Sequence, residues 1–303
     1  MAKPAAQVML ILAAVLTTSA ALAAERTFDK RLDAPPGGRL TFDADVGSVA
    51  VTGGDTRQVV VHADLEGSDT FLNSLHISAE QTPTGVTISA RKDHDGWFPW
   101  FNFEWGGGVR FTVEVPRDYP VDLKTAGGGI DVRNLNASVN GNTSGGGIRV
   151  QNVAGTVDVH TSGGGIQAER INGSANLSTS GGSIGVTDSS GDLYLRTSGG
   201  GINIQNEDGK VDAHTSGGSI HAELRSNDGI DLGTSGGGIT LLLPQNTHAS
   251  IDASTSGGSV SSDLPVSTIG TVNGSHLHGS IGGGGPSISL HTSGGSIHIQ
   301  PGS

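Results

Sequence analysis

The chain has 303 residues, a formal net charge of −12 at pH 7 and no cysteine. The acidic balance makes nucleic acids and anionic membrane surfaces poor partners, because binding to phosphates needs clustered Lys and Arg. The lack of cysteine excludes disulfides, thiolate metal sites and a lipidated cysteine. Glycine accounts for 50 residues, far above the usual share of about 7%, so the chain is either disordered or built from a strict repeat.

The first 23 residues have the pattern of a signal peptide. Lys3 supplies a positive charge, residues 8–16 (VMLILAAVL) form an apolar run too short to span a bilayer, and residues 21–23 (ALA) form a small-x-small cleavage site. We therefore expect residues 1–23 to be removed and the protein to be exported to the periplasm, the cell surface or the extracellular space. No other long apolar run follows, so we expect no transmembrane anchor.

Residues 24–124 show the alternation of short strands rather than a regular repeat. Apolar and polar residues alternate in four stretches, the last of which, 109–115, ends before Pro116. Proline cannot donate to a strand ladder. We expect this region to form an irregular β cap that covers the first regular coil, because an uncapped solenoid end is an open sheet edge.

One segment of this cap concentrates the aromatic residues. Residues 97–105 (WFPWFNFEW) hold all three tryptophans and six of the twelve Phe, Trp and Tyr residues. Two interpretations stay open: a small satellite core beneath the cap, or an exposed loop that contacts a glycan, a lipid or a protein. The candidate ligand-binding residues are Trp97, Phe98, Trp100, Phe101, Phe103 and Trp105.

From residue 125 to residue 303 the sequence is a repeat of Thr-Ser-Gly-Gly-(Gly/Ser)-Ile and close variants of it. The copies begin at Thr125, Thr143, Thr161, Thr179, Thr197, Thr215, Thr234, Thr255 and Thr292. Those from Thr143 to Thr215 are eighteen residues apart, and residues 276–281 (HLHGSI) form a degraded copy before the last. A period this regular excludes a disordered linker and indicates a solenoid.

Apolar residues occupy fixed places in each copy. Those of the second are Ile148, Val150, Val153, Val157 and Val159. Their period of two predicts strands, and Asn, Asp and Gly between them predict a turn, as in residues 207–209 (EDG). One coil alone buries too little to offset its ordering cost, so successive coils must pair in parallel. The expected fold is all-β: a parallel β-solenoid (β-helix) of roughly ten coils of about 18 residues with an irregular N-terminal β cap.

Two polar columns recur in the repeats. One stands three residues before each Thr: Asp122, Asn140, Asp158, Asn176, Tyr194, Asp212, Asp231 and Asp252. We interpret it as a solvated face rather than a calcium site, because like charges about 4.8 Å apart in water repel by only about 0.9 kcal/mol. His160, His214 and His291 stand just before their Thr. The first two are three coils or about 14 Å apart, too far to share zinc, so we expect no metal and no cofactor.

No catalytic motif is visible. The Gly-rich corners lack the Gly-Lys-Ser/Thr and the following helix of a phosphate loop, and no Gly-x-Ser-x-Gly stands at a strand-to-helix elbow. The repeats have few basic residues and no dense acid cluster of the kind used in glycoside cleavage. We therefore expect a protein that is not an enzyme.

Three features of the sequence match a known family. Residues 43–51 form an Asp-x-x-x-Gly-Ser-Val-x-Val unit, residues 109–125 contain a strand that ends in Val-Pro, and tandem Ser-Gly-Gly-x-Ile units follow. Together they resemble the bacterial putative adhesin family, a β-strand-repeat domain of unknown function, over nearly the whole mature chain. The resemblance implies a solenoid and an envelope location, and it offers no catalytic residues.

Binding or scaffolding is the class of function that remains. We expect an exported, non-enzymatic, adhesin-like binding or structural β-solenoid of the bacterial envelope, whose partner is an envelope glycan, lipid or protein. The alternatives are an envelope-stress or regulatory accessory protein that binds a membrane or protein partner, and a carbohydrate-active β-helix enzyme. The identity of the ligand, the handedness of the solenoid and the oligomeric state stay open.

Overall fold

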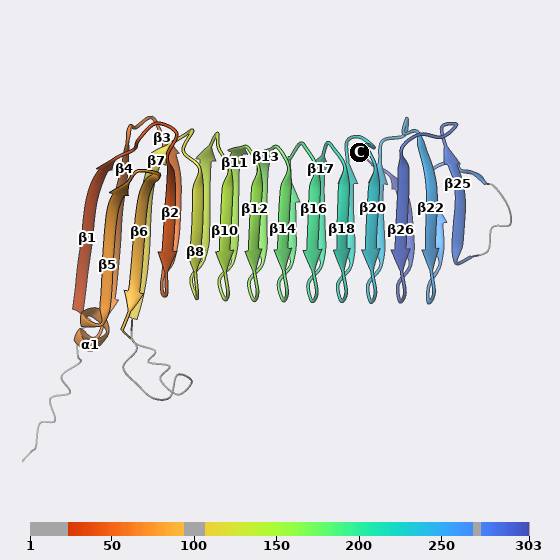
Figure 1. The fold of residues 1–303 in the computed structure, drawn as a ribbon. Helices are drawn as coiled ribbons and strands as arrows, with labels where there is room; N and C mark the ends of the chain where they lie inside the picture. Colours follow the sequence, from red (N-terminus) through yellow and green to blue (C-terminus); the bar gives the residue numbers. More distant parts are fainter. Residues whose placement is uncertain (1–23, 94–106, 269–273, 303) are drawn as a thin grey trace, which may run out of the picture.

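A computed structural model describes residues 24–93, 107–268 and 274–302, which form two long sheets (Figure 1). Sheet A has the spatial order β1 (Ala24–Asp33), β4 (Gln58–Gly67), β7 (Gly107–Pro116), β3 (Ser48–Gly54), β9 (Ile130–Leu135), β11 (Ile148–Ala154), β13 (Ile166–Asn172), β15 (Ile184–Thr187), β17 (Ile202–Glu207), β19 (Ile220–Leu224), β21 (Ile239–Leu243), β27 (Ile297–Pro301) and β23 (Val260–Ser262). Sheet B has the order β24 (Ser267–Thr268), β25 (His276–Ile281), β22 (Ala249–Thr255), β26 (Ser287–Thr292), β20 (Ile230–Thr234), β18 (Val211–Thr215), β16 (Leu193–Thr197), β14 (Ala175–Thr179), β12 (Val157–Thr161), β10 (Val139–Thr143), β8 (Val121–Thr125), β2 (Arg39–Ala44), β6 (Gly85–Lys92) and β5 (Leu75–Thr82).

The repeats form the expected coils. Each coil follows a strand of sheet B, turns through the Thr-Ser-Gly-Gly corner and returns along a strand of sheet A, as β10 and β11 do. Successive coils pair in parallel and in register, so that Val157 lies opposite Val139 and Ala175. The five apolar residues predicted to point inward in the copy that begins at Thr143 are at most 2% exposed. The all-β parallel solenoid is confirmed.

One threonine in each coil fastens its corner to the neighbouring coil. The Oγ1 of the buried Thr161 donates to the carbonyl oxygen of Gly146 at 2.8 Å and accepts from the N–H of Gly164 at 3.3 Å. The bond to the neighbouring coil recurs at all nine repeat threonines, at 2.7–2.8 Å. A buried hydroxyl without a hydrogen-bond partner costs about 1–3 kcal/mol. Each threonine hydroxyl is therefore satisfied only when the neighbouring coil is stacked beside it.

The second glycine of each corner is required by the spacing of the stacked backbones. A Cβ atom on Gly146 would collide with the carbonyl group of Gly128 in the neighbouring corner. A Cβ atom on the preceding residue, Gly145, would lie 3.4 Å from its nearest neighbour, the carbonyl oxygen of Gly127, which is an ordinary contact. Two adjacent glycines of the same corner therefore differ in whether a side chain fits.

The stack begins earlier than the Thr-Ser-Gly-Gly repeat does. β2 and β3 pair in parallel with β8 and β9, so regular coils start at Arg39, inside the 24–124 region that the sequence predicted as a cap. This coil does not match the repeat pattern, because its corner, residues 45–47 (DVG), has one glycine and no threonine. Its Gly47 carbonyl nevertheless accepts the bond from Thr125, at 2.8 Å.

Antiparallel strands close the N-terminal end, as an irregular β cap would. β1 and β4 in sheet A and β5 in sheet B run antiparallel to their neighbours, and α1 (Asp69–Asn73) joins β4 to β5 (Figure 1). Between the sheets, the rings of Phe42 and Phe111 pack edge to face with centroids 4.9 Å apart. No helix in the described part of the chain is long and apolar enough to cross a membrane.

The C-terminal coils do not stack in sequence order. β26 lies between β20 and β22 (Figure 1). In sheet A, β27 likewise lies between β21 and β23, so the last coil is inserted one place early. The sequence predicted residues 276–281 as a degraded coil, which is wrong: they form β25, which pairs antiparallel with β22. Their string HLHGSI lacks the Thr-Ser-Gly-Gly corner that holds a parallel coil.

Glu207 interrupts a column of buried residues in sheet A. The column comprises Leu135, Val153, Ile171, Ser189, Glu207 and Leu224. The sequence placed Glu207 in a turn, whereas its side chain is fully buried and its carboxylate oxygens have no hydrogen-bond partner among the described residues. Burial raises the pKa of Glu207 from 4.5 to about 8, although the nearby charge of Arg225 lowers it.

Substituting the two adjacent corner glycines tests the stacking constraint. Gly146→Ala should lower the free energy of unfolding by about 1–3 kcal/mol or more, because the new methyl group must push two backbones apart. Gly145→Ala should stay within about 1 kcal/mol of the wild type, because the methyl group has room. Urea unfolding followed by far-UV circular dichroism measures both, and equal midpoints for the two variants would contradict the constraint.

The stability of the wild type should depend on pH through Glu207. Its pKa in the folded state, about 8, exceeds the 4.5 of the free side chain, so the stability that its protonated form permits is present below about pH 4.5 and is lost as the pH rises through about 8. The Gln of Glu207→Gln does not titrate. The difference in the free energy of unfolding between this variant and the wild type should therefore grow in favour of the variant from about pH 4.5 to about pH 8, by on the order of 4 kcal/mol.

The matched control is Glu114→Gln, which removes one negative charge from an exposed position on β7. The free energy of unfolding is measured by urea titration between about pH 5 and 8. If the free energy of unfolding changes with pH in the same way for the wild type and both Gln variants, the carboxyl group of Glu207 is not buried without a partner.

Candidate functional site

The outer face of sheet B carries the first predicted polar column in register. Seven of its members are consecutive neighbours from β8 to β20: Asp122, Asn140, Asp158, Asn176, Tyr194, Asp212 and Asp231. Ser289 of the inserted coil stands between Asp231 and Asp252, so these two acids are not neighbours. Tyr194 is 38% exposed and is the single exposed large hydrophobic residue in the described ranges.

The second polar column brings together two histidines that are far apart in the sequence. His214 is the register partner of Gly233, and Gly233 is the partner of His291, because the inserted β26 pairs with β20. His214 and His291 are therefore two strands apart. His160 lies three strands from His214, as the sequence predicted. The proximity of His291 cannot be read from the repeat, since it depends on the order of the coils.

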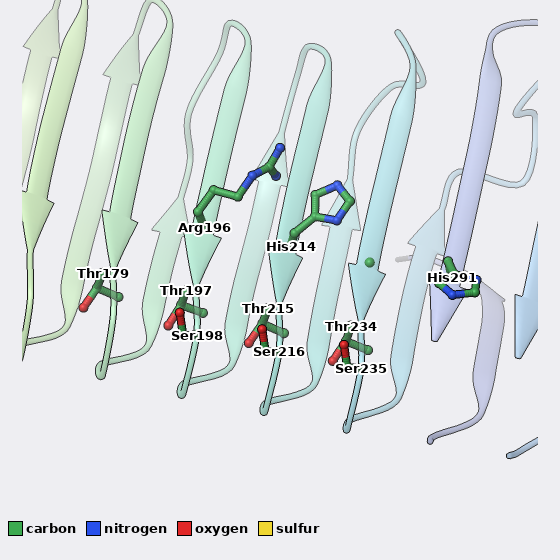
Figure 2. Close-up of a pocket in the computed structure, with 11 residues that line it drawn as sticks. Thr179, Arg196, Thr197, Ser198, His214, Thr215, Ser216, Thr234, Ser235 and His291 are labelled. Atoms are coloured by element: carbon green, nitrogen blue, oxygen red, sulfur yellow. The ribbon is translucent and has the colours of Figure 1, made fainter. Parts of the chain in front are cut away.

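A shallow groove of about 440 Å³, here called the sheet B groove, crosses this face from β14 to β26 (Figure 2). Hydroxyl groups, one arginine and two histidines surround it. Its lining residues are Thr179, Arg196, Thr197, Ser198, His214, Thr215, Ser216, Gly233, Thr234, Ser235 and His291. The four threonines among them are buried, and their hydroxyls already bond within the corners. Contacts with a partner are therefore left to the three serines, Arg196 and the two histidines, which donate and accept hydrogen bonds in several directions and suit a polar partner that lies across several coils.

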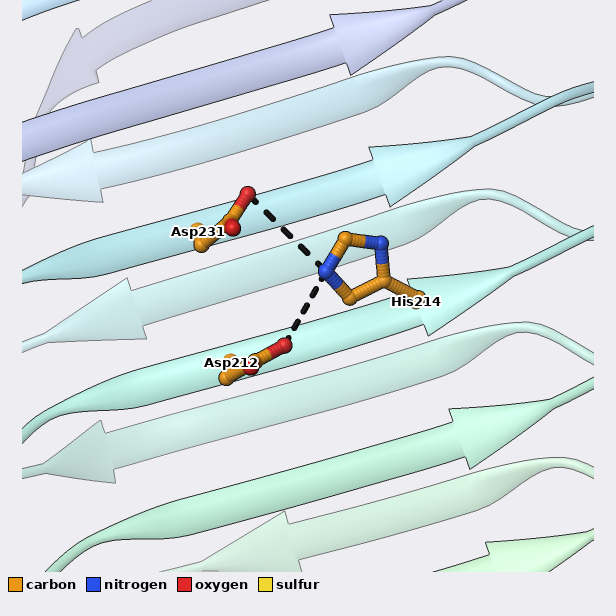
Figure 3. Close-up of side chains that lie close together, drawn as sticks. All are labelled: Asp212, His214 and Asp231. Atoms are coloured by element: carbon orange, nitrogen blue, oxygen red, sulfur yellow. Dashed lines mark ion pairs between the residues drawn. The ribbon is translucent and has the colours of Figure 1, made fainter.

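Three side chains meet at one point beside this groove (Figure 3). The Nε2 atom of His214 lies 3.0 Å from Oδ1 of Asp212 and 3.9 Å from Oδ1 of Asp231. The guanidinium group of Arg196 donates to the same Asp212 oxygen at 2.7 Å. Partial burial by itself would raise the pKa of Asp212, but the hydrogen bond and charge of Arg196, helped by other nearby positive charges, outweigh burial and hold this pKa below its usual value.

Gly233 makes this arrangement possible. A Cβ atom at position 233 would collide with Nδ1 of His214, so the imidazole ring occupies space that any other residue would fill. The sequence signal is an Asp-x-His at residues 212–214, followed in the next coil by an Asp-x-Gly at residues 231–233. Sequence reasoning predicted the two aspartates as neighbours but missed the role of the glycine.

The six aromatic residues predicted as ligand-binding lie outside the described residues: Trp97, Phe98, Trp100, Phe101, Phe103 and Trp105. The strands on either side of them are described. Lys92 ends β6 in sheet B, and Gly107 begins β7 in sheet A. The choice between satellite core and exposed loop therefore stays a hypothesis.

Solved structures of bacterial proteins resemble this chain at low identity. A protein from Bacteroides fragilis described as a "putative adhesin" is 14% identical, with 92% of this chain and 97% of that chain covered and a TM-score of 0.39. A "putative lipid binding protein" from Parabacteroides distasonis is 12% identical, with coverage of 92% and 97% and a TM-score of 0.34. A "putative cell adhesion protein" from Clostridium sporogenes is 14% identical, with coverage of 92% and 100% and a TM-score of 0.27.

With TM-scores below 0.5, these likenesses support no inference about what the chain binds. No curated protein matches it. The match to a family model is of a different kind, because it spans residues 38–300, from the strand before the first coil corner to the last strand of sheet A. It confirms the family that the repeats and the Val-Pro strand predicted: the chain belongs to the family described as Toastrack DUF4097.

Proposed function

We propose that this protein is an exported, non-enzymatic, adhesin-like binding protein of the bacterial envelope that holds an extended polar partner, such as a glycan, on the outer face of sheet B. The observation that carries the proposal is the sheet B groove, which crosses five strands and is lined by hydroxyl, guanidinium and imidazole groups. Export rests on the signal-peptide pattern of residues 1–23.

The composition of this face favours sugar hydroxyls over lipid. Tyr194 lies on the same face of β16 as Arg196, two residues before it, and offers a flat ring beside groups that donate hydrogen bonds. Apart from Tyr194, the described ranges expose no large hydrophobic side chain. A lipid surface would need a larger apolar patch.

Two serine–histidine contacts inside sheet B favour binding over catalysis, whereas a third, Ser261 with His298 at 2.8 Å, involves the edge strand β23 of sheet A. Ser178 Oγ lies 2.8 Å from His160 Nδ1, and Ser254 Oγ lies 3.1 Å from His291 Nδ1. Both pairs stand on strands whose neighbours on each side are hydrogen-bonded in the sheet. The backbone N–H groups of such strands are engaged in ladders, so they do not form the oxyanion hole that a serine nucleophile requires.

The second candidate function is that of an accessory protein that binds a membrane or protein partner through residues 97–105. The concentration of all three tryptophans in this segment favours it, because binding energy is often concentrated in a few aromatic anchors. The two functions use different parts of the chain and are separable by substitution.

The groove and the Tyr194 ring beside it are tested with the double variant Tyr194→Ala/Arg196→Ala. Binding to purified envelope glycans should fall about tenfold or more, because an aromatic face and a charged donor are lost together. The matched control is Asn140→Ala/Asn142→Ala, which changes the same two columns on β10, outside the groove. It should keep wild-type affinity. Equal affinities for both double variants would remove the groove from the proposal.

The aromatic segment is tested with the triple variant Trp97→Ala/Trp100→Ala/Trp105→Ala. If this segment anchors the protein, binding to liposomes or envelope protein fractions should drop at least about tenfold while the far-UV circular dichroism spectrum is retained. Loss of the β spectrum would instead assign these rings to a core. Unchanged binding with an intact spectrum would eliminate the segment as the contact.

A further inference from the structure

We propose that Asp212, His214 and Asp231 bind one divalent transition-metal ion of the zinc type. Each residue offers one ligand atom, and the three atoms lie within 4.8 Å of one another. This is the single group of at least three such ligand residues found in the described ranges. The proposal stands independently of the proposed function, because a glycan can bind this face with or without a metal ion.

The geometry is close to that of a zinc site before the ion enters. With bonds of about 2.0–2.1 Å, the ligand atoms of a tetrahedral zinc ion are about 3.3 Å apart. The two measured separations from His214 Nε2, 3.0 Å to Asp212 and 3.9 Å to Asp231, lie on either side of that value. The third separation, between the two carboxylate oxygens, is at most 4.8 Å. Side-chain rotations that move the ligand atoms by about half an ångström to one and a half ångströms would bring all three to the tetrahedral spacing, and water would complete the coordination.

The chemistry of the ligands selects the class of ion. One imidazole nitrogen with two carboxylate oxygens suits Zn²⁺, Co²⁺ or Ni²⁺. Ca²⁺ prefers 6–8 oxygen ligands, which this face does not gather around the three residues. Arg196 already holds the Asp212 carboxylate by a hydrogen bond of 2.7 Å. Such outer contacts orient a ligating carboxylate and strengthen a site.

The site is built by the register of two adjacent coils. Asp212 and His214 are two residues apart on β18 and therefore share its outer face. Asp231 on β20 is the register partner of Asp212, and Gly233 is the partner of His214. Because Gly233 has no side chain, the ring of His214 leans over β20 toward Asp231 (Figure 3).

The same chain contains a natural comparison. Asp158 and His160 on β12 repeat the Asp-x-His pattern, but the next coil presents Asn176 and Ser178 in place of the second aspartate and the glycine. There the Asp158 carboxylate accepts from Asn176 at 3.0 Å, and His160 Nδ1 lies 2.8 Å from Ser178 Oγ. His160 thus has the same strand position as His214 without the second carboxylate, which makes it the matched control.

The experiment uses the full mature chain without a polyhistidine tag, freed of metal and titrated with Zn²⁺, Co²⁺ or Ca²⁺ alone. Isothermal titration calorimetry should give about one equivalent of Zn²⁺, and bound Co²⁺ should show the visible absorption of nitrogen and oxygen coordination. His214→Gln and Asp231→Asn should each weaken Zn²⁺ binding about tenfold or more. His160→Gln should bind as the wild type does.

Gly233→Ser provides a second, independent variant, because it keeps all three ligands and fills only the space of the ring. It should weaken Zn²⁺ binding to a similar degree, with an unchanged circular dichroism spectrum. The proposal is overturned if the wild type takes up no Zn²⁺, or if His160→Gln loses as much affinity as His214→Gln. Ca²⁺ binding as tight as that of Zn²⁺, and insensitive to His214→Gln, would overturn it as well.

Discussion

The close contact between stacked corners is the constraint on which the rest of the structure depends. Parallel strands in a sheet lie about 4.8 Å apart, and the corners must keep that spacing where the chain leaves one sheet for the other. Gly146 permits this spacing because it has no side-chain atom that would lie between the two backbones. At this spacing, the hydroxyl of Thr161 reaches the carbonyl oxygen of Gly146. Each corner thereby fixes where the next strand starts. This sets the register between coils, so that equivalent residues of successive coils align in columns on the inner and outer faces.

The uniformity of the corners leaves the order of the coils unspecified. Thr255 bonds to Gly295 and Thr292 to Gly237, both at 2.7 Å, as the other repeat threonines do with their own neighbours. Nothing in such a corner distinguishes the next coil along the chain from another coil of the same sequence. The last coil therefore fits between two earlier ones, and antiparallel strands that cannot continue the stack close the end. This insertion places His291 two strands from His214.

The inward columns could be predicted from the sequence because two periods coincide there. A period of two selects the buried face, and a period of eighteen stacks Ile166 on Ile148 and Ile184. The same period of eighteen places Glu207, 36 residues after Ile171, in the buried column, but its charge and the following Asp-Gly are typical of a turn, so the sequence predicted a turn there. At the site, the neighbouring aspartates followed from the period, whereas the lean of His214 followed from a missing side chain on the next strand. The aromatic segment, residues 97–105, lies outside what the structure describes, so its role is still a hypothesis from sequence.

The fold separates the residues that hold the coils together from those available for recognition. Corners and inward columns carry the stacking, so they tolerate little change, while the outer columns contribute little to it. Between the pair β12–β14 and the pair β18–β20, the outer positions beside Asp-x-His change from Asn176 and Ser178 to Asp231 and Gly233. The corner bonds are the same in both, at 2.7–2.8 Å. Two outer substitutions thus turn a row of ordinary hydrogen bonds into a cluster of three ligand atoms without disturbing the stack, so in this protein recognition is to be sought where one coil departs from the next.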